Sequence, residues 1–382
     1  MPQQPIYLDY NATTPLDPAV VEAMLPALQT HFGNPSSSHA YGRYAQHLVQ
    51  RGRLQLAELL GASSEEIVFT GNGTEASNHA IRGMAQTRWD ERHRWQIITS
   101  AIEHPATMEP CLKLREAGFP VTFLPVDRYG VVDVQALQEA LKRPTLLVTI
   151  MHSNNEIGTL QPITEIAQMA KAQGAWMHTD VAQSLGKVSI DVDTLGVDLL
   201  TVAGHKLYAP KGIGALYIRT GTRLPSFVLG AGHERGRRAG TENVPYIVGL
   251  GQAAEIVQHT AHESEQQLRT RRDRLWQLIE TGLSERVTLH GHPTERLPNT
   301  LNFSVRGWIG EELLEACPGI AGSTGAACHA GKVEVSHVHT AMGVPLTIAK
   351  GAIRLSVGRF TTNDEVERGA AALIESVLDS RI

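Results

Sequence analysis

Residues Asp198–Ile218 read DLLTVAGHKLYAPKGIGALYI, and this stretch decides how the chain folds. An apolar run over Leu199–Ala203 stops at a glycine, a histidine and Lys206, and a second run over Ala215–Ile218 follows further turn residues. Short apolar runs bounded by turn residues are typical of buried strands. The pattern therefore predicts that Lys206 stands at a strand end. Such a lysine is either a partly buried side chain with a solvated amine or a desolvated amine that bonds an aldehyde.

Working outward from this stretch, apolar runs of strand length alternate with helical patterns from Ile67 onward. This alternation predicts an α/β fold with a mainly parallel sheet that is covered by helices on both faces. Ligands in such sheets bind at the carboxyl ends of the strands. Polar residues follow each of the expected strand ends, which are Thr70, Ser100, Met151, Asp180 and Ala203.

The alternation fades after about Gly240. A long helical pattern over 241–282 is followed by short strands and helices, which is typical of a smaller α+β unit. A chain of 382 residues also exceeds the size at which one core stops growing. We therefore expect a large domain over residues 15–250 and a small domain formed by residues 1–14 and 251–382.

The composition limits the classes of function. Hydrophobic residues make up 42% of the chain and charged residues 19%, as in soluble globular proteins with a large core. A net charge of −5 gives no argument for binding nucleic acid or an anionic membrane. No export signal or spanning segment is evident. Three scattered cysteines favour neither disulfides nor a metal site, so we expect a cytoplasmic protein without metal.

Several groups at the strand ends fit one cofactor. The turn GNGTE at 71–75 lies between a strand and a helix, where backbone N–H groups and Thr74 are able to hold a phosphate. It serves equally well as a plain tight turn. His104 follows the next strand, where its ring is able to stack on an aromatic cofactor. Asp180 ends a buried strand and needs a cationic or donor partner. A phosphate turn, Asp180 and Lys206 together are the three fixed contacts of a pyridoxal phosphate (PLP) site.

Two further residues stand out near the C-terminus. Arg354 lies in an apolar strand pattern and therefore needs an anion, such as a substrate carboxylate. Cys328 lies in GSTGAACHAG at 322–331, and small residues on both sides argue against simple core packing. A lone cysteine is nevertheless most often a buried small hydrophobe. We expect this stretch to be a mobile loop.

Motifs along nearly the whole chain resemble the cysteine desulfurase and selenocysteine lyase family, in the class V branch of fold-type I PLP enzymes. This resemblance implies a PLP-dependent transferase fold of type I with a small C-terminal domain. The matching motifs are YLDYNATTP, FGNPSSSH, IVFTGNGTEASN, the EH pair, HSNNEIG, HTDVAQSLGK, GHKLYAPKGIGALY, RRAGTEN, RLPNTLNFSVRG, STGAACHAG and IRLSVGRFTT.

The resemblance implies the cofactor contacts, one position at a time. Lys206 bonds the PLP aldehyde and moves protons. Asp180 pairs with the ring nitrogen, His104 stacks on the ring, and Gln183 bonds the phenolic oxygen. The other cofactor contacts that it implies are Gly73, Thr74, Asn155, His205 and, from a second subunit, Thr241. A homodimer is expected for this reason.

The resemblance also implies the substrate contacts. Asn155 and Arg354 hold the substrate carboxylate together with Asn34, and Cys328 is the nucleophile that takes the sulfur. The implied reaction converts L-cysteine to L-alanine and leaves a persulfide on Cys328, for an acceptor protein such as one in iron–sulfur cluster assembly. A thiolate is the reactive form of cysteine, so a nearby base such as His104 would help.

Three positions depart from the family pattern. Ala203 stands where a serine is frequent, Asn72 where the phosphate turn usually has glycine, and His233 where glutamine is expected. The sequence GAACH resembles selenocysteine lyases more closely, so release of selenide from L-selenocysteine is an alternative. A class V aminotransferase would retain Lys206 but have no use for Cys328. A scaffold with a decayed site is disfavoured by the intact cofactor set.

Overall fold

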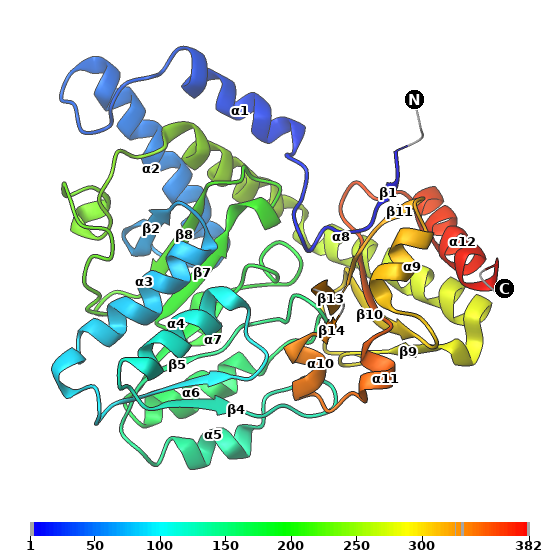
Figure 1. The fold of residues 1–382 in the computed structure, drawn as a ribbon. Helices are drawn as coiled ribbons and strands as arrows, with labels where there is room; N and C mark the ends of the chain where they lie inside the picture. The colour runs from blue at the N-terminus through cyan, green and yellow to red at the C-terminus, as the bar shows by residue number, and fades with distance from the viewer. Residues whose placement is uncertain (1–3, 325, 330–331, 380–382) are drawn as a thin grey trace.

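A seven-stranded sheet forms the centre of the larger part of the molecule in the computed structural model (Figure 1). The structure describes residues 4–324, 326–329 and 332–379, and it describes no side chain between 325 and 334. The strand order is β2-β8-β7-β6-β5-β3-β4. Only β8 runs antiparallel to its neighbours, so the predicted mainly parallel sheet is confirmed. The strands are β2 (Ile67–Thr70), β3 (Gln96–Ser100), β4 (Val121–Leu124), β5 (Thr145–Thr149), β6 (Trp176–Asp180), β7 (Leu199–Ala203) and β8 (Gly214–Ile218).

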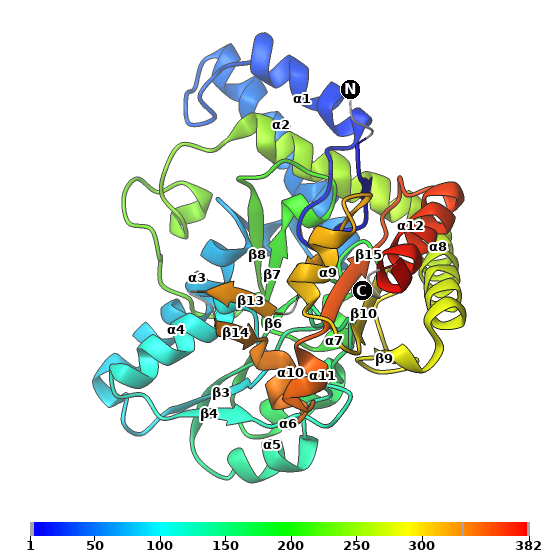
Figure 2. The same ribbon diagram turned by 45° about the vertical axis from the view of Figure 1, so that its right-hand side comes forward.

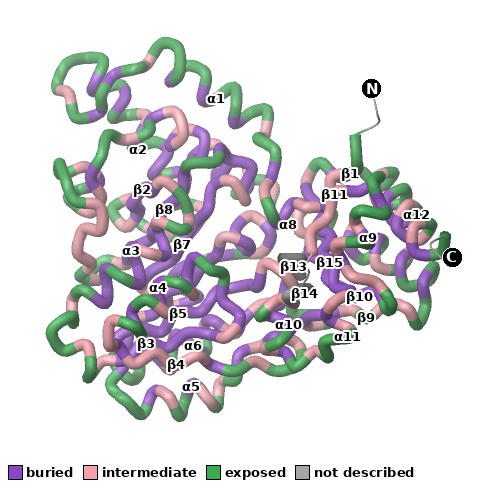
Figure 3. Tube along the Cα trace, viewed as in Figure 1, coloured by how far each residue is buried: buried purple, intermediate pink, exposed green. Residues whose placement is uncertain are grey.

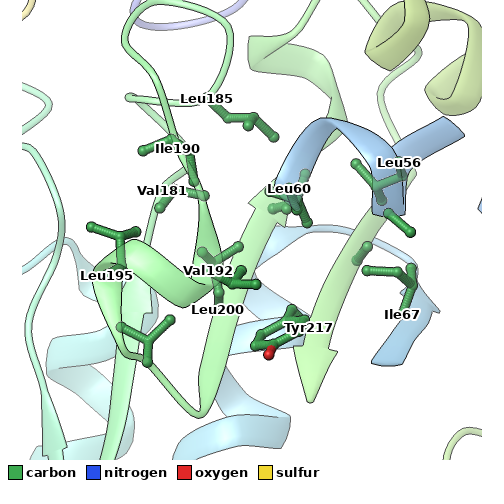
Figure 4. Packing of buried hydrophobic residues seen from close by; sticks show 14 of the residues in the cluster. Leu56, Leu60, Ile67, Val181, Leu185, Ile190, Val192, Leu195, Leu200 and Tyr217 are labelled. Atoms are coloured by element: carbon green, nitrogen blue, oxygen red, sulfur yellow. The ribbon is translucent and has the colours of Figure 1, made fainter. Parts of the chain in front are cut away.

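Helices cover both faces of this sheet because the strand residues alternate between two apolar clusters. On one face, Val68 and Leu216 pack against α3 (Gly73–Gln86) and α4 (Pro105–Glu116). On the other face, Ile67 and Tyr217 pack with Leu56 of α2 (Ala40–Leu60), as Figure 4 shows. The remaining helices of this second face are α1 (Pro18–Gln29), α5 (Val134–Ala140), α6 (Ile163–Ala172), α7 (Val192–Leu195) and the first half of α8 (Val244–Leu283).

A four-stranded antiparallel sheet in the order β12-β15-β10-β9 forms the smaller part of the molecule. The N-terminal β1 joins this part by pairing with β11, and Leu8 is fully buried in its core. The elements are β1 (Ile6–Tyr7), β9 (Val287–Leu289), β10 (Thr300–Val305), β11 (Ile320–Ala321), β12 (Ser323–Thr324), β15 (Ala352–Ser356), α9 (Gly310–Ala316), α10 (His337–Ala341), α11 (Leu346–Ala349) and α12 (Asn363–Asp379).

The long helix α8 runs from one part to the other. Val257 belongs to the core of the large sheet, whereas Leu268, three turns further on, belongs to the core of the small sheet. Buried residues lie toward both ends of the helix, whereas the residues between Val257 and Leu268 are exposed or half-buried; Figure 3 colours each residue of the chain by its burial. From these two cores we propose the division into a large domain (15–250) and a small domain (1–14 and 251–382).

Two element boundaries and one loop differ from those expected from the sequence. Strand β5 ends at Thr149 and not at Met151, because the Glu103 carboxylate takes the Met151 N–H at 3.0 Å. Helix α8 begins at Val244 and not at Thr241, because the Asn243 side chain caps it. The backbone around Cys328 is not a loop, since β13 (Ala326–His329) pairs with β14 (Lys332–Val335). Figures 1 and 2 place this hairpin between the two parts of the molecule.

Among the described residues, no helix is both long and apolar enough to span a membrane.

Candidate active site

The carboxyl ends of the parallel strands surround a cavity of about 440 Å³. This is the size of a pocket for a small organic molecule and the edge of the sheet at which such pockets occur. Most of the residues singled out from the sequence line it, and these are Gly73, Thr74, His104, Asn155, Asp180, Gln183, His205, Lys206 and Arg354.

Lys206 stands in the short turn (Gly204–Lys206) directly after β7, as predicted. Its Nζ donates to the main-chain oxygens of Asn11 and Ala12, the latter at 2.7 Å. Burial and then the charge of Arg354 lower the Lys206 pKa to about 8, against the opposing charges of Asp9 and Asp180. A substantial fraction of the amine is therefore neutral near pH 8, which is the form that attacks an aldehyde.

Asp180 ends β6 and is buried beside the cavity. Its Oδ1 accepts from the Ala182 N–H at 2.8 Å, and the described residues give Oδ2 no hydrogen-bond donor. Burial raises the Asp180 pKa to about 6, although the Ala182 N–H and the charge of Lys206 oppose this. A cationic N–H group in the cavity would supply the missing partner.

The N-terminus of α3 faces the same cavity. Asn72 caps the helix, since its side chain accepts from the Glu75 N–H at 2.8 Å. Its φ of −176° is extended backbone that any residue adopts, which explains why asparagine replaces the usual glycine here. The backbone N–H groups of Gly73 and Thr74 have no acceptor among the described residues, so they are available to an anion.

Packing against the start of α3 explains the small side chain at position 203. A Cβ atom placed on Gly73 would lie only 3.0 Å from the Ala203 Cβ, so the helix end and the strand end are in close contact. The small side chain at 203 fits this contact, but it provides no hydroxyl for a phosphate. The anion-binding groups at this point are therefore the N–H groups of α3, with His205 nearby.

His104 caps α4, and its Nδ1 accepts from the Ala106 N–H at 3.1 Å. The neutral ring therefore carries its proton on Nε2. Desolvation and then the charge of Lys206 lower the His104 pKa, so the ring is neutral over most of the physiological range. A neutral imidazole is suited to stacking on a ring and to accepting a proton.

Gln183 links the cavity to the N-terminal segment. Its Nε2 donates to the main-chain oxygen of Asn11 at 2.9 Å, which is the same oxygen that Lys206 contacts. The Asn11 side chain is in turn fixed by the small domain, where Asn299 Nδ2 donates to its Oδ1 at 2.9 Å and Thr300 Oγ1 accepts from its Nδ2 at 2.8 Å. Asn11 therefore joins two cavity residues to the small sheet.

Arg354 reaches the cavity from β15 of the small sheet. One guanidinium nitrogen donates to the main-chain oxygen of Asn155 at 2.9 Å, and the other pairs with Asp9 at 2.7 Å. Its Nε is buried and has no partner among the described residues. The Asn155 side-chain amide lines the cavity, again without a partner among the described residues. A carboxylate ligand would be well placed to use these donors.

Two predicted site residues, Asn34 and Thr241, are not among the described residues that line the cavity, and a third, Cys328, is not described at its side chain. Asn34 is exposed in the loop after α1, where its Oδ1 accepts from the Ser36 N–H. Thr241 is exposed before α8 and borders a separate cavity. Cys328 lies on β13, but its side chain is outside the described residues.

Two ion pairs tie the basic loop at 230–243 to neighbouring segments. Arg235 pairs with Glu65 and Arg238 pairs with Glu75, both at 2.8 Å. These two arginines therefore have carboxylate partners within the chain.

Sequence reasoning missed four supporting residues, which are Asp9, Asn11, Glu103 and Lys187. Asn11 offered a weak signal as a polar residue in an extended segment with no obvious helix to cap. Glu103 is buried, and burial raises its pKa to about 8 against its hydrogen bonds from Ser100 and Met151. Among the described residues, no cluster of histidine, cysteine, aspartate or glutamate is arranged to hold a metal ion.

Comparisons with known proteins agree with this geometry. The model of the class-V aminotransferase family matches residues 6–368, so the chain belongs to the aminotransferase class-V family, and its relatives within that family are cysteine desulfurases. "Cysteine desulfurase IscS" of Methanosarcina thermophila is 47% identical over 95% of this chain and 89% of that protein. The enzyme of the same name from Dictyoglomus turgidum is 44% identical over 94% and 91% of the two chains.

Solved structures place the chain in the same group. A "NifS-like protein" superimposes with a TM-score of 0.92 at 35% identity, covering 98% of this chain and all of that one. A structure described as "SspA in complex with cysteine" gives a TM-score of 0.81 at 36% identity, covering 93% and 99%. The expected fold-type I architecture and the resemblance found in the sequence motifs are therefore confirmed.

Proposed function

We propose that this chain is a PLP-dependent cysteine desulfurase that converts L-cysteine to L-alanine and transfers the sulfur to Cys328. One observation carries the proposal. Three groups meet in one cavity, and these are a lysine amine with a lowered pKa, a buried carboxyl and the N–H groups of a helix end. Among the described residues the carboxyl has no ion-pair partner and the N–H groups have no acceptor.

The residues of the cavity fit PLP. Asp180 would hold the pyridine N–H, Lys206 the aldehyde carbon, and the N-terminus of α3 with Thr74 and His205 the phosphate. When bound, the ring supplies an electron sink for the bond that breaks at the substrate Cα. The α3 donors and the charge of Lys206 favour an anion, which is consistent with a phosphorylated cofactor.

The protein side chains then have separate roles in binding and deprotonating the substrate. Arg354 and Asn155 bind the carboxylate, with Asn34 as the third proposed contact, and so aim the Cα–H bond at Lys206. Lys206 takes the Cα proton on Nζ and returns it later. His104 Nδ1 accepts from the Ala106 N–H, and Nε2 already carries the ring proton, so the ring takes a proton from Cys328 or a ligand only when Nδ1 gives up this hydrogen bond.

The test is to incubate the pure protein, loaded with PLP, with L-cysteine and a reductant. Equal amounts of L-alanine and sulfide are expected. A keto acid that retains the thiol of cysteine, formed only when an added keto acid takes the amino group, would instead identify an aminotransferase, whereas pyruvate with ammonia and sulfide would identify a β-elimination. Absence of any product from L-cysteine would overturn the proposal.

The choice between sulfur and selenium is tested at Cys328. Removal of sulfur from cysteine needs an attacking thiolate, whereas the weaker C–Se bond releases selenium more readily. Cys328→Ala should therefore stop alanine formation from L-cysteine and leave a measurable rate with L-selenocysteine under anaerobic conditions. Unchanged activity with cysteine would remove Cys328 from the proposed mechanism.

We also propose a homodimer, in which Thr241 of each subunit completes the phosphate site of the other. An exposed apolar surface supports this. Val21, Leu25 and Leu28 lie on one face of α1 and are 40%, 41% and 55% exposed. Phe32, Tyr41, Tyr44 and Leu54 add exposed apolar area on and near α2. Monomers rarely expose such a patch.

Sedimentation velocity tests the dimer. The wild type should sediment as a dimer, and Leu25→Glu with Leu28→Glu should shift it to the monomer and weaken PLP binding. A monomeric wild type with full PLP affinity would contradict both the dimer and the shared site. The proposed acceptor of the sulfur is a second protein.

A further inference from the structure

A buried lysine contacts a cavity residue without lining the cavity itself. Lys187 is only 7% exposed. Its Nζ donates to two oxygens of Gln183, the main-chain oxygen at 2.9 Å and the side-chain Oε1 at 3.0 Å. None of the ion pairs among the described residues includes Lys187. A buried cation without a carboxylate is costly, so its presence needs an explanation.

The number of acceptors explains how this lysine is accommodated. A neutral amine has two N–H groups, and Gln183 supplies two acceptors for them. A charged amine would carry a third N–H with no acceptor among the described residues. Burial, followed by the charges of Lys206 and Arg354, lowers the Lys187 pKa well below its usual value, in agreement with this count. The two acceptors therefore fit a neutral amine that donates two hydrogen bonds.

These bonds determine which way the Gln183 amide is turned. The main-chain oxygen of Asn11 only accepts, so the amide atom 2.9 Å from it is Nε2. The oxygen Oε1 then faces Lys187, which donates to it. Gln183 lines the cavity, and its second Nε2 hydrogen has no acceptor among the described residues. The side chain therefore offers a donor to the cavity and withholds its acceptor.

We propose that Lys187 is a positioning residue, which holds both oxygens of Gln183 so that the amide offers only an N–H to an oxygen acceptor bound in the cavity. This inference rests on the proposed function, because the acceptor is the phenolic oxygen of PLP. A hydrogen bond to that oxygen withdraws negative charge from it. A neighbouring proton would be carried by the nitrogen that joins Lys206 to the cofactor. Because the phenolic oxygen then has less negative charge, it would hold this proton less tightly. Loss of the donor raises the pH at which this proton leaves.

The charged and titratable groups that face this proton from the surrounding elements are Asp180, His104, His205 and Arg354, with Asp9 behind Arg354. All of them are unchanged by a substitution at position 187. Because Lys187 is neutral, Lys187→Met removes two hydrogen bonds and leaves the net charge around the cavity as it was. A shift in the titration therefore reports the Gln183 amide and not a lost charge.

The experiment is a pH titration of the visible absorption band of the PLP-loaded protein. In Lys187→Met the midpoint should rise by about one pH unit, the size expected for losing one hydrogen bond to a charged group. Gln183→Ala should shift it in the same direction, and the double variant should shift no further than Gln183→Ala alone. The matched control is Lys211→Met, which removes an exposed lysine of the same region and should leave the midpoint unchanged.

A wild-type midpoint in Lys187→Met would overturn the inference, and so would a double variant in which the two shifts add. Failure of the proposed function looks different, because the wild-type protein would then show no visible band on addition of PLP. Thermal melting reports whether each variant folds. Should Lys187→Met fail to fold, Lys187→Gln keeps a donor on a shorter side chain. Its midpoint should lie above that of the wild type, and an unchanged midpoint would again overturn the inference.

Discussion

The carboxyl edge of the large sheet and the N-terminal segment at 7–15 serve the same cavity in different ways. The sheet edge contributes side chains, such as Asp180 and Lys206, whose places follow from the pairing of their strands. The N-terminal segment contributes mainly main-chain oxygens, which receive Lys206 and Gln183. Side-chain functions can be recognised in a sequence, whereas a main-chain oxygen is the same at every position. The supporting half of the site is therefore hidden from sequence analysis.

Replacement of the sheet-edge lysine should have the largest effect. Lys206→Ala removes the only amine that lines the cavity among the described residues, so alanine formation from L-cysteine should fall below detection. PLP should still bind through its phosphate, but without the visible band of a lysine adduct. Lys211→Ala, five residues further on and exposed, is the control and should retain activity. Normal turnover by Lys206→Ala would contradict the site as a whole.

Asp180→Asn should cause the second-largest loss of activity. The neutral amide cannot stabilise a protonated ring nitrogen, and loss of one partner from a buried charge pair costs roughly 4 kcal/mol, or about a thousandfold in kcat. Asp198→Asn is the matched control, because Asp198 lies near the opposite edge of the sheet and its side chain accepts the Met177 N–H. Steady-state kinetics with both variants give the comparison. Equal losses in the two would indicate a general effect of the substitution and not a role in the cavity.

Much of the fold was predictable, since the alternation of apolar runs gave β7 with the boundaries that the structure shows and β6 with its end at Asp180. Helix α2 ends at Gly61 in the left-handed conformation that glycine favours. The small domain was harder to predict because its pairings join distant segments. For example, Ile6 pairs with Ile320, and no local pattern records that contact. The hairpin that carries Cys328 was missed because Ala326 and Ala327 of its first strand have weak strand preference.

Site residues could be predicted where their role follows from the neighbouring sequence, and not where it depends on a distant segment. Asp180 and Lys206 follow apolar strands directly, so their placement at one edge could be inferred from the parallel sheet. The partners of Arg354 could not be inferred, because Asp9 lies 345 residues away in the chain. Asn34 and Thr241 came only from the family resemblance. Both lie away from this cavity within one chain, and their proposed roles need the second subunit.

Arg354→Lys tests the contribution of the small sheet. The guanidinium is held by Asn155 and Asp9, and a single ammonium group cannot keep both contacts and bind a carboxylate with two hydrogen bonds. We expect KM for L-cysteine to rise by about 10- to 30-fold, equivalent to ~1.5–2 kcal/mol, with a smaller change in kcat. Initial rates over a range of cysteine concentrations measure this. An unaltered KM would assign the carboxylate to another residue.

The pH dependence of PLP capture tests the desolvated state of Lys206. The Lys206 pKa is lowered to about 8, and only the neutral amine attacks the aldehyde. The rate should therefore rise by about tenfold from pH 7 to pH 9 and then level off, since the neutral fraction grows through the pKa and saturates above it. Stopped-flow absorbance of the apoprotein mixed with PLP gives the rate. A rate that still rises steeply at pH 10 would indicate an ordinary solvated lysine.

Asn11→Ala should have the smallest effect on kcat/KM. It tests most directly the N-terminal segment, whose main-chain contacts cannot be recognised in the sequence. The substitution keeps the main-chain oxygen that receives Lys206 and Gln183, but it removes the side chain that ties this oxygen to the small sheet. We expect kcat/KM to fall by about three- to tenfold, because the amine is less well placed, and stability to fall by ~1–3 kcal/mol from the partners left unpaired. Asn299→Ala is the control, since it breaks one of the same bonds without changing the segment. If Asn11→Ala lowers the melting temperature as Asn299→Ala does but leaves kcat/KM at the wild-type value, the segment is a structural tether, and the sheet edge alone positions Lys206.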